Sequence, residues 1–213
     1  RTGIFISIFL ACLGTAHAAA VGVPDSADAL LQAAYEGDAS AVAKLIKSGA
    51  PVGAANMFGA TPMGEASRRG DAAVLKLLLE AGADPESANA EGQTALMSVA
   101  RTGNLEAARL LLKHGAKIDA REKWGGQTAL MWAAAQNQPE MIRFLASKGA
   151  EVDARSTVRD WPRRMTAEER PKDLNRGGLS GLMFAARDGK IEAARALLAA
   201  GASVNFTDPD GST

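Results

Sequence analysis

A Gly-Ala pair recurs at nearly constant intervals through most of this 213-residue chain, and this limits the possible folds more than any other feature. Successive pairs are separated by 33, 33, 34 and 52 residues, and a second marker that begins with Thr or Ser repeats at intervals of 33, 34 and 52. Periods of this length are typical of solenoids, in which each unit covers its apolar face only by stacking on its neighbours. The Gly-Ala pairs begin at Gly49, Gly82, Gly115, Gly149 and Gly201.

Each repeat has the signals of two short helices joined by a tight turn. In the third repeat, Thr94 is a suitable N-cap for a first helix that ends near Gly103. A second helix follows from about Asn104, and Gly115 fits the left-handed position that stops it. Every repeat is therefore predicted to be a helix, a turn, a second helix and a projecting loop. The apolar stripe of the second helix consists of Leu105, Ala108, Leu111 and Leu112.

These repeats resemble the ankyrin family, in which T-P-L-H-x-A-A is followed by a glycine and then by L-L-L-x-x-G-A-D-V-N-A. The third repeat reads TALMSVARTGNLEAARLLLKHGAKIDA, the fourth TALMWAAAQNQPEMIRFLASKGAEVDA and the fifth SGLMFAARDGKIEAARALLAAGASVNF. The resemblance implies an all-α repeat fold, an ankyrin-type solenoid of helix-turn-helix units with projecting loops and about five repeats visible. Asn137 replaces the glycine between the helices of the fourth repeat, and asparagine tolerates the same left-handed conformation. The family's first-helix histidine, which ties the loops together, is replaced by Leu31, Gly64, Met97, Met131 and Met183.

The repeat frame divides the chain into segments. We expect a signal peptide at 1–18, an ankyrin-repeat domain at 26–213, repeats near 26–58, 59–91, 92–125, 126–154 and 179–211, and a loop insertion at 155–178. The insertion is either a finger that contacts a partner through Trp161, or a solvated loop that is tolerated because long loops cost little entropy. The last repeat would leave an apolar face uncovered, which predicts that this chain is a fragment of a longer array truncated at both ends. That face is predicted to contain Ile191, Leu197 and Leu198.

The N-terminal segment has the features of a secretory signal peptide. Arg1 precedes an apolar stretch at 3–13, and Ala16-His17-Ala18 offers a cleavage site. We therefore expect a bacterial-type signal and a protein that is exported to the periplasm or secreted. Two alternatives remain: the uncharged residues 3–23 form an uncleaved anchor, or Cys12 is lipidated. A membrane association is expected only under one of these alternatives.

The composition gives little support to catalysis, metal binding or nucleic-acid binding. The 24 basic and 24 acidic residues cancel, so no overall attraction to nucleic acid is expected. After cleavage, His114 would be the only histidine, and its place in the last turn of a helix suits a structural role. We therefore predict a protein that is not an enzyme and has no catalytic residues, cofactor or metal. The carboxylates that recur once per repeat, Glu65, Glu106, Glu140 and Glu192, are expected to be solvated.

The predicted interaction surface is the concave face formed by the first helices and the loop tips. Aromatic residues and arginines dominate the binding energy of protein interfaces. The candidate partner-binding residues are Phe58, Arg68, Arg101, Trp124, Trp132, Trp161, Phe184 and Arg187. An alternative for Trp132 and Phe184 is that they pack against the next repeat.

These observations favour a non-catalytic scaffold, exported, that binds a partner protein of unknown identity through the concave face and loop tips. The alternative is an accessory repeat region of a larger enzyme or receptor whose chemistry lies outside this fragment. A third idea is that the aromatic groove recognises a cell-wall polymer or a small ligand.

Overall fold

The computed structural model describes residues 26–158, 177–209 and 211, and the helices in this part of the chain come in five consecutive pairs. Each pair has a first helix, a tight turn and a second helix. The pairs are α1 (Ser26–Glu36) with α2 (Ala39–Lys47), α3 (Pro62–Arg69) with α4 (Ala72–Glu80), α5 (Ala95–Thr102) with α6 (Leu105–Lys113), α7 (Ala129–Ala135) with α8 (Pro139–Ser147), and α9 (Gly181–Arg187) with α10 (Ile191–Ala199).

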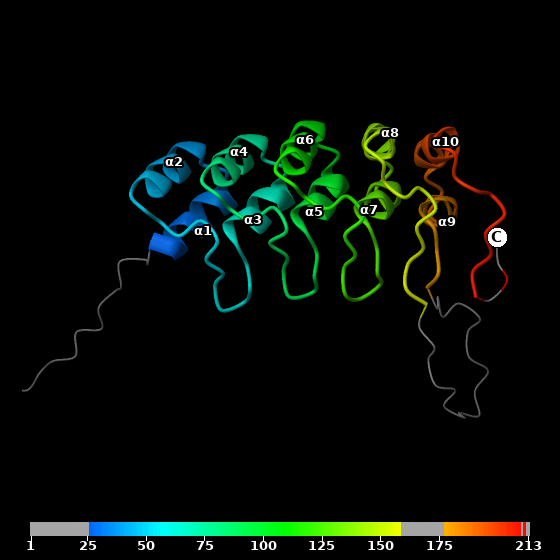
Figure 1. The fold of residues 1–213 in the computed structure, drawn as a ribbon, viewed down its shortest axis with the longest axis horizontal. Helices are drawn as coiled ribbons and strands as arrows, with labels where there is room; N and C mark the ends of the chain where they lie inside the picture. The colour runs from blue at the N-terminus through cyan, green and yellow to red at the C-terminus, as the bar shows by residue number, and fades with distance from the viewer. Residues whose placement is uncertain (1–25, 159–176, 210, 212–213) are drawn as a thin grey trace, which may run out of the picture.

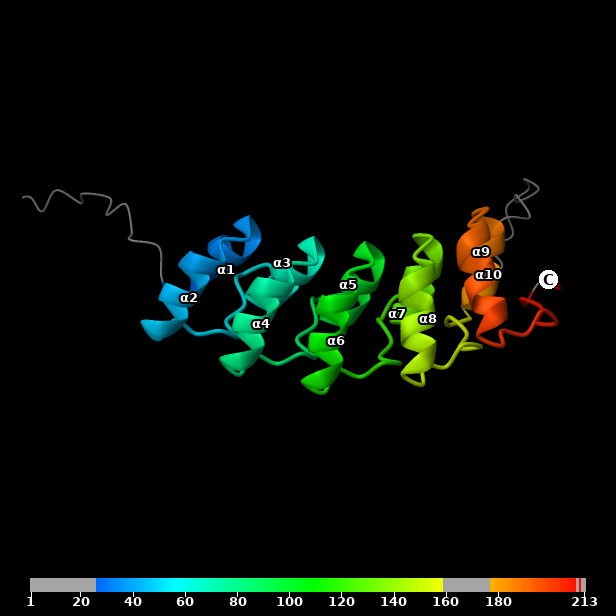
Figure 2. The same cartoon turned by 90° about the horizontal axis from the view of Figure 1, so that it is seen from above.

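The pairs stack side by side into an elongated array of two helical layers (Figure 1). The first helices form one layer and the second helices form the other, and both layers keep the order of the chain when the molecule is seen from above (Figure 2). The loops that join one pair to the next project from the side of the first helices. We call these loops fingers; those at 48–61, 81–94 and 114–128 are described completely. The predicted all-α solenoid of helix-turn-helix units is confirmed.

Polar caps and left-handed glycines explain why the helices are short. The hydroxyl of Thr61 accepts a hydrogen bond from the backbone N–H of Gly64, and Thr94 caps α5 in the same way. Gly70 ends α3 in the left-handed conformation. In the fourth pair Asn137 takes a φ of 55°, which confirms that asparagine replaces glycine in this turn.

A continuous core fills the space between the layers. Small side chains on the first helices, such as Ala66, Ala100 and Ala133, are completely buried and allow adjacent helices to approach closely. The second helices contribute larger side chains, including Leu78 and Leu111, which are also completely buried. Because the core passes through the contact between every two pairs, each pair depends on its neighbours for stability.

Side chains also connect neighbouring pairs through hydrogen bonds to the backbone. The amide nitrogen of Asn104 donates to the carbonyl oxygen of Gly70, one repeat earlier, at 2.7 Å. Carboxylates at corresponding loop positions accept bonds of 2.8–3.0 Å from backbone N–H groups one repeat later. These carboxylates belong to Glu86, Asp119 and Asp153. The connections fix the register of one pair on the next.

The last pair differs in part from its prediction. Ile191 is 63% exposed and Leu198 is 47% exposed, as expected for an uncovered face, but Leu197 is completely buried. Leu197 points into the core because consecutive residues of an α-helix are about 100° apart, so it lies on a different face of α10 from Leu198. No helix in the described ranges is long and apolar enough to cross a membrane. The predicted signal peptide at 1–18, the alternatives at 3–23 and Cys12, and most of the insertion lie outside the described residues.

Candidate partner-binding surface

Two rows of residues follow the first helices on the side of the fingers. The first row consists of the residues that directly follow the position of the family's histidine, and most of its side chains are shielded from solvent. Glu65, Ser98 and Phe184 are buried and Trp132 is half-buried. Three residues further along each helix, the side chains reach solvent. This second row contains Tyr35, Arg68, Arg101 and Arg187, all exposed. The surface available to a partner is therefore the second row, with the fingers beside it.

The fingers are closed by side chains that accept hydrogen bonds from their own backbone. Asn56 accepts from the N–H groups of Phe58 and Ala60 at 2.9 and 3.0 Å. In the next finger, Asn89 accepts from Gln93 at 2.9 Å. These side chains satisfy backbone N–H groups of the finger that would otherwise need water, and they favour the closed conformation of the loop.

The third finger has the most extensive closure. The Glu122 carboxylate is buried and accepts from the backbone N–H groups of Trp124, Gly125 and Gln127 at 2.5, 2.7 and 3.0 Å. Hydrogen bonds to an ionised acceptor are stronger than those to a neutral one. The Glu122 carboxylate also accepts more bonds from its own finger than Asn56 or Asn89 accepts in the other two completely described fingers.

Large apolar side chains stand at the tips of two of these fingers. Phe58 is 80% exposed and its neighbour Met57 is 90% exposed. Trp124, which lies at the corresponding position two repeats later, is 64% exposed. Among the described residues, these tips carry the most prominent exposed apolar side chains on the finger side of the molecule.

Phe184 is not an exposed contact residue: it packs against the preceding repeat, whereas the sequence left open either exposure or packing against the next repeat. It is 7% exposed and belongs to a small cluster with Met131, Ala154 and Leu179. The side chain turns inward because this pocket between the fourth and fifth pairs is lined by apolar groups. The guanidinium of Arg187 lies over the Phe184 ring at 5.1 Å from its centroid, so Phe184 supports an exposed residue of the surface.

Trp132 packs partly into the main core and offers only part of its ring to a partner. Its Nε1 is buried and, within the described part of the chain, has no hydrogen-bond partner; the same is true of Thr128 Oγ1 one helical turn earlier. Thr128 also makes no capping bond with its side chain, unlike Thr61 and Thr94. Trp161 lies outside the described residues.

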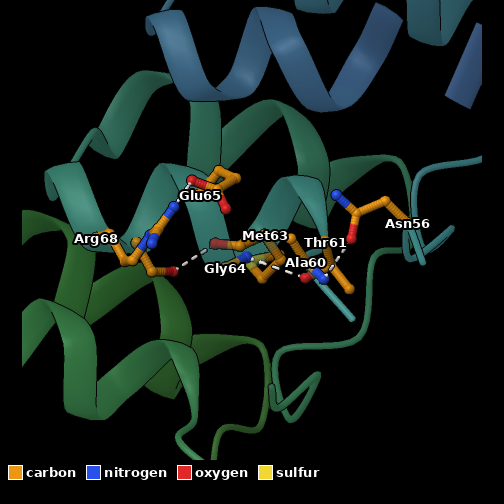
Figure 3. A network of polar contacts seen from close by, with 8 residues as sticks. Asn56, Ala60, Thr61, Met63, Gly64, Glu65 and Arg68 are labelled. Carbon is orange, nitrogen blue, oxygen red and sulfur yellow. Dashed lines mark hydrogen bonds and ion pairs between the residues drawn. The ribbon is translucent and has the colours of Figure 1, made fainter. Parts of the chain in front are cut away.

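Glu65 is the one recurring carboxylate for which the expectation of solvation is wrong. Its side chain is 9% exposed and forms an ion pair with Arg68, whose side chain is 55% exposed. Figure 3 shows the two residues on α3, with Asn56 and Thr61 nearby. The carboxylates of Glu106, Glu140 and Glu192 are exposed, because they lie on the second helices, which face away from the fingers.

A groove of about 340 Å³ lies between the second and third pairs, and Glu65 is part of its wall. Its walls come from two adjacent fingers and from α3 and α5. A second hollow, of about 210 Å³, lies on the other side of Glu65, beside Tyr35. Glu65 thus separates two neighbouring depressions on the surface that contains the second row.

The remaining electrostatic features are local. A hydrogen bond from the Arg187 side chain, together with its positive charge, holds the pKa of Asp188 below its ordinary value, although slight burial acts in the opposite direction. His114 is the C-cap residue of α6 and is exposed. In the ranges that the structure describes, no group of three or more His, Cys, Asp or Glu side chains lies together in a way that could hold a metal ion.

Sequence reasoning missed the residues that shape this surface. Asn56, Asn89 and Glu122 are separated by 33 residues each, so a polar residue two positions before each finger tip was a visible signal. Gly64 was visible as a departure from the family pattern, but the groove beside it could not be foreseen from spacing alone.

Comparison with known protein families agrees with the observed architecture. A family model for three copies of the ankyrin repeat matches residues 30–121 and 65–156, and a model for a single ankyrin repeat matches residues 177–209. No curated protein matches the chain.

Proposed function

The chain belongs to the ankyrin-repeat family, whose repeats generally mediate protein–protein interaction, and we propose that it is a non-catalytic scaffold. It binds a partner protein through the finger tips and the exposed second row of the first helices. The observation that carries this proposal is the presence of Phe58 and Trp124, 80% and 64% exposed, on fingers that are closed by hydrogen bonds.

Rigid fingers make these aromatic tips effective anchors. A loop that is ordered before binding loses little conformational entropy when it docks, so more of the contact energy becomes affinity. Phe58 and Trp124 are also large enough to fill pockets on a partner. The arginines of the second row, Arg68, Arg101 and Arg187, can add charged hydrogen bonds around these anchors.

We also propose that the protein acts outside the cytoplasm, in the periplasm or in the extracellular space. The support is the sequence of residues 1–18, with its basic start, apolar stretch and small residues around His17. N-terminal sequencing of the protein from the exported fraction tests this proposal. A new N-terminus at Ala19 would support it, and a chain that stays in the cytoplasm with its N-terminal segment intact would contradict it.

The binding role is tested by affinity capture from the proteins of the source organism, followed by mass spectrometry. The double variant Phe58→Ala/Trp124→Ala is compared with the wild type and with Leu198→Ala. Leu198 is 47% exposed on α10, in the other helical layer, so its removal also deletes exposed apolar surface but away from the fingers.

We expect at least one protein to be retained by the wild type and by Leu198→Ala but lost by the double variant. Circular dichroism should show the same helical content in all three, because no buried side chain is changed. Equal capture of the same proteins by the double variant and the wild type would contradict the proposed surface.

A further inference from the structure

The groove between the second and third pairs coincides with one exception in the repeat frame. The other first helices carry Leu31, Met97, Met131 or Met183 at the position that Gly64 occupies in α3. In α5, the side chain of Met97 is completely buried and its sulfur lies 3.5 Å from the backbone nitrogen of Thr94. A Cβ added at Gly64 would have one neighbour within 4 Å, the Thr61 hydroxyl at a close 3.3 Å, and Gly64 itself lines the groove.

Glu65, the next residue, places an incompletely paired carboxylate in the wall of this groove. Its Oε2 contacts Arg68, whereas its Oε1 has no hydrogen-bond partner among the residues that the structure describes. The side chain is 9% exposed, so a partner that covers the groove would remove the remaining water from Oε1. A buried charge without a donor is costly, and the partner must therefore supply one.

The lining of the groove favours a positive donor. It contains the carboxylates of Glu65 and Glu91 and one cationic side chain, Arg68, so its formal charge is negative. The other polar lining groups are neutral hydroxyls and amides, and Phe58 adds an aromatic ring at the finger tip. Neutral lining groups of this kind can accept further hydrogen bonds from a multivalent donor.

We propose that this groove binds an arginine side chain of the partner protein, with the guanidinium donating to Glu65. The proposal rests on the proposed function and names the chemistry of one contact within it. A guanidinium has five donors in a planar fork, is more weakly hydrated than an ammonium group, and stacks on aromatic rings. These properties match a carboxylate wall, several neutral acceptors and the ring of Phe58.

The test uses short peptides and the whole chain labelled with ¹⁵N. Acetyl-Gly-Arg-Gly-amide is titrated into the protein and followed by NMR, beside the same peptide with lysine and with citrulline, a neutral analogue of arginine. We expect saturable shifts of the Gly64, Glu65 and Ser98 amides with the arginine peptide. The shifts should be weaker with lysine and absent with citrulline.

Two variants locate the binding. Glu65→Gln removes the charge and should weaken binding of the arginine peptide at least about tenfold, as expected for loss of a hydrogen bond to a charged group. Gly64→Met leaves Glu65 unchanged and fills the groove with the residue that three other repeats carry; it should abolish the shifts. Methionine is also a better helix former than glycine, so this variant is expected to fold.

The matched control is Glu140→Gln. Glu140 and Arg143 form an ion pair at the same i,i+3 spacing on α8, but both side chains are exposed, at 65% and 55%. This variant should bind the arginine peptide as the wild type does. An effect as large as that of Glu65→Gln would show that general charge, not the groove, attracts the peptide.

The inference is overturned by any of three results: no saturable shift at the solubility limit of the arginine peptide, equal shifts with citrulline, or unchanged binding in Gly64→Met.

Failure of the groove assignment can be distinguished from failure of the proposed function. If Phe58→Ala/Trp124→Ala loses partner capture while the peptide does not bind, only the groove assignment falls. If the peptide binds as expected but the double variant captures normally, the groove assignment stands and the finger-tip anchors fall.

Discussion

Replacing Glu122 by glutamine tests whether one side chain holds the third finger in place. Glu122 Oε1 accepts from the N–H groups of Gly125 and Gln127, and Oε2 accepts from the N–H of Trp124. Glutamine keeps one oxygen and can preserve the first two bonds. Its NH₂ group must then face the Trp124 N–H, so a donor meets a donor and the third bond is lost.

The magnitude follows from this geometry. A hydrogen bond to a charged group contributes about 1.5–3 kcal/mol, and Glu122 as a whole residue is only 6% exposed, so little water is available to replace the lost bond. We expect Glu122→Gln to lower the free energy of opening the finger by about 2 kcal/mol. That change corresponds to roughly a 30-fold larger opening equilibrium constant.

Native-state hydrogen exchange measures this opening directly. The Trp124 and Gly125 amides should exchange roughly 30-fold faster in the variant, whereas core amides such as that of Leu111 should change much less, because the opening is local. Glu91→Gln is the control, since Glu91 lies in the preceding finger and its side chain is exposed. Unchanged protection of the Trp124 amide in Glu122→Gln would refute the conclusion that this carboxylate fixes the finger.

Three further predictions concern stability and titration. Leu111→Ala, in a completely buried site of the central pair, should lower the free energy of unfolding in urea by about 2–5 kcal/mol, and a loss below about 1 kcal/mol would contradict the stacked core. Gly59→Ala and Gly92→Ala each place a side chain at a positive φ, of 74° and 78°, which costs about 1–2 kcal/mol of stability. Gly92→Ala should lower the midpoint of thermal unfolding more than Gly59→Ala does. The reason is that the new Cβ at position 92 would lie 3.2 Å from a backbone nitrogen of the next finger, whereas a Cβ at position 59 has nothing within 4 Å. The hydrogen bond from Arg187 lowers the pKa of Asp188 in the folded state. The small stabilisation from this bond is therefore present above the pKa of Asp188 in the unfolded chain and is lost as the pH falls through its pKa in the folded protein. Arg187→Gln should raise the pKa of Asp188 back toward its ordinary value, as followed by NMR of the carboxyl carbon.

The helical frame could be predicted from the sequence because its signals are local and repeated. A capping hydroxyl such as that of Thr94 and a left-handed glycine such as Gly103 act within a few residues of their own positions. The capping Thr or Ser returns in four repeats and the glycine between the helices also in four, so the copies confirm one another. Even the replacement of a turn glycine by Asn137 followed from the conformational preference of a single residue.

The exposure of individual side chains was harder to predict because it depends on the neighbouring pair. Glu65 and Glu140 look alike in sequence, each followed by an arginine three positions later. Glu65 lies on a first helix between two fingers and is buried, whereas Glu140 lies on a second helix and is exposed. Phe184 is buried by residues of the fourth pair, which the repeat pattern alone does not bring to it.

The hydrogen bonds within the fingers explain how these loops are held without the family's histidine. The residues in its place, such as Met97, bury an apolar side chain beside the cap and do not bond the loops through a ring. The bonds that hold each finger come instead from its own residues, Asn56, Asn89 and Glu122.

These bonds do not involve the position of the family's histidine, so the residue there differs between repeats while the fingers stay closed. Gly64 has no side chain at this position, and the groove that it lines lies between two fingers that remain closed. The groove at Gly64 opens to the surface, whereas the Met97 side chain at the same position of α5 is completely buried in the core. Glycine inside a helix costs about 0.5–1 kcal/mol relative to alanine, and α3 also lacks the apolar side chain that Met97 buries in α5, so a repeat with this groove is expected to be less stable than one with methionine.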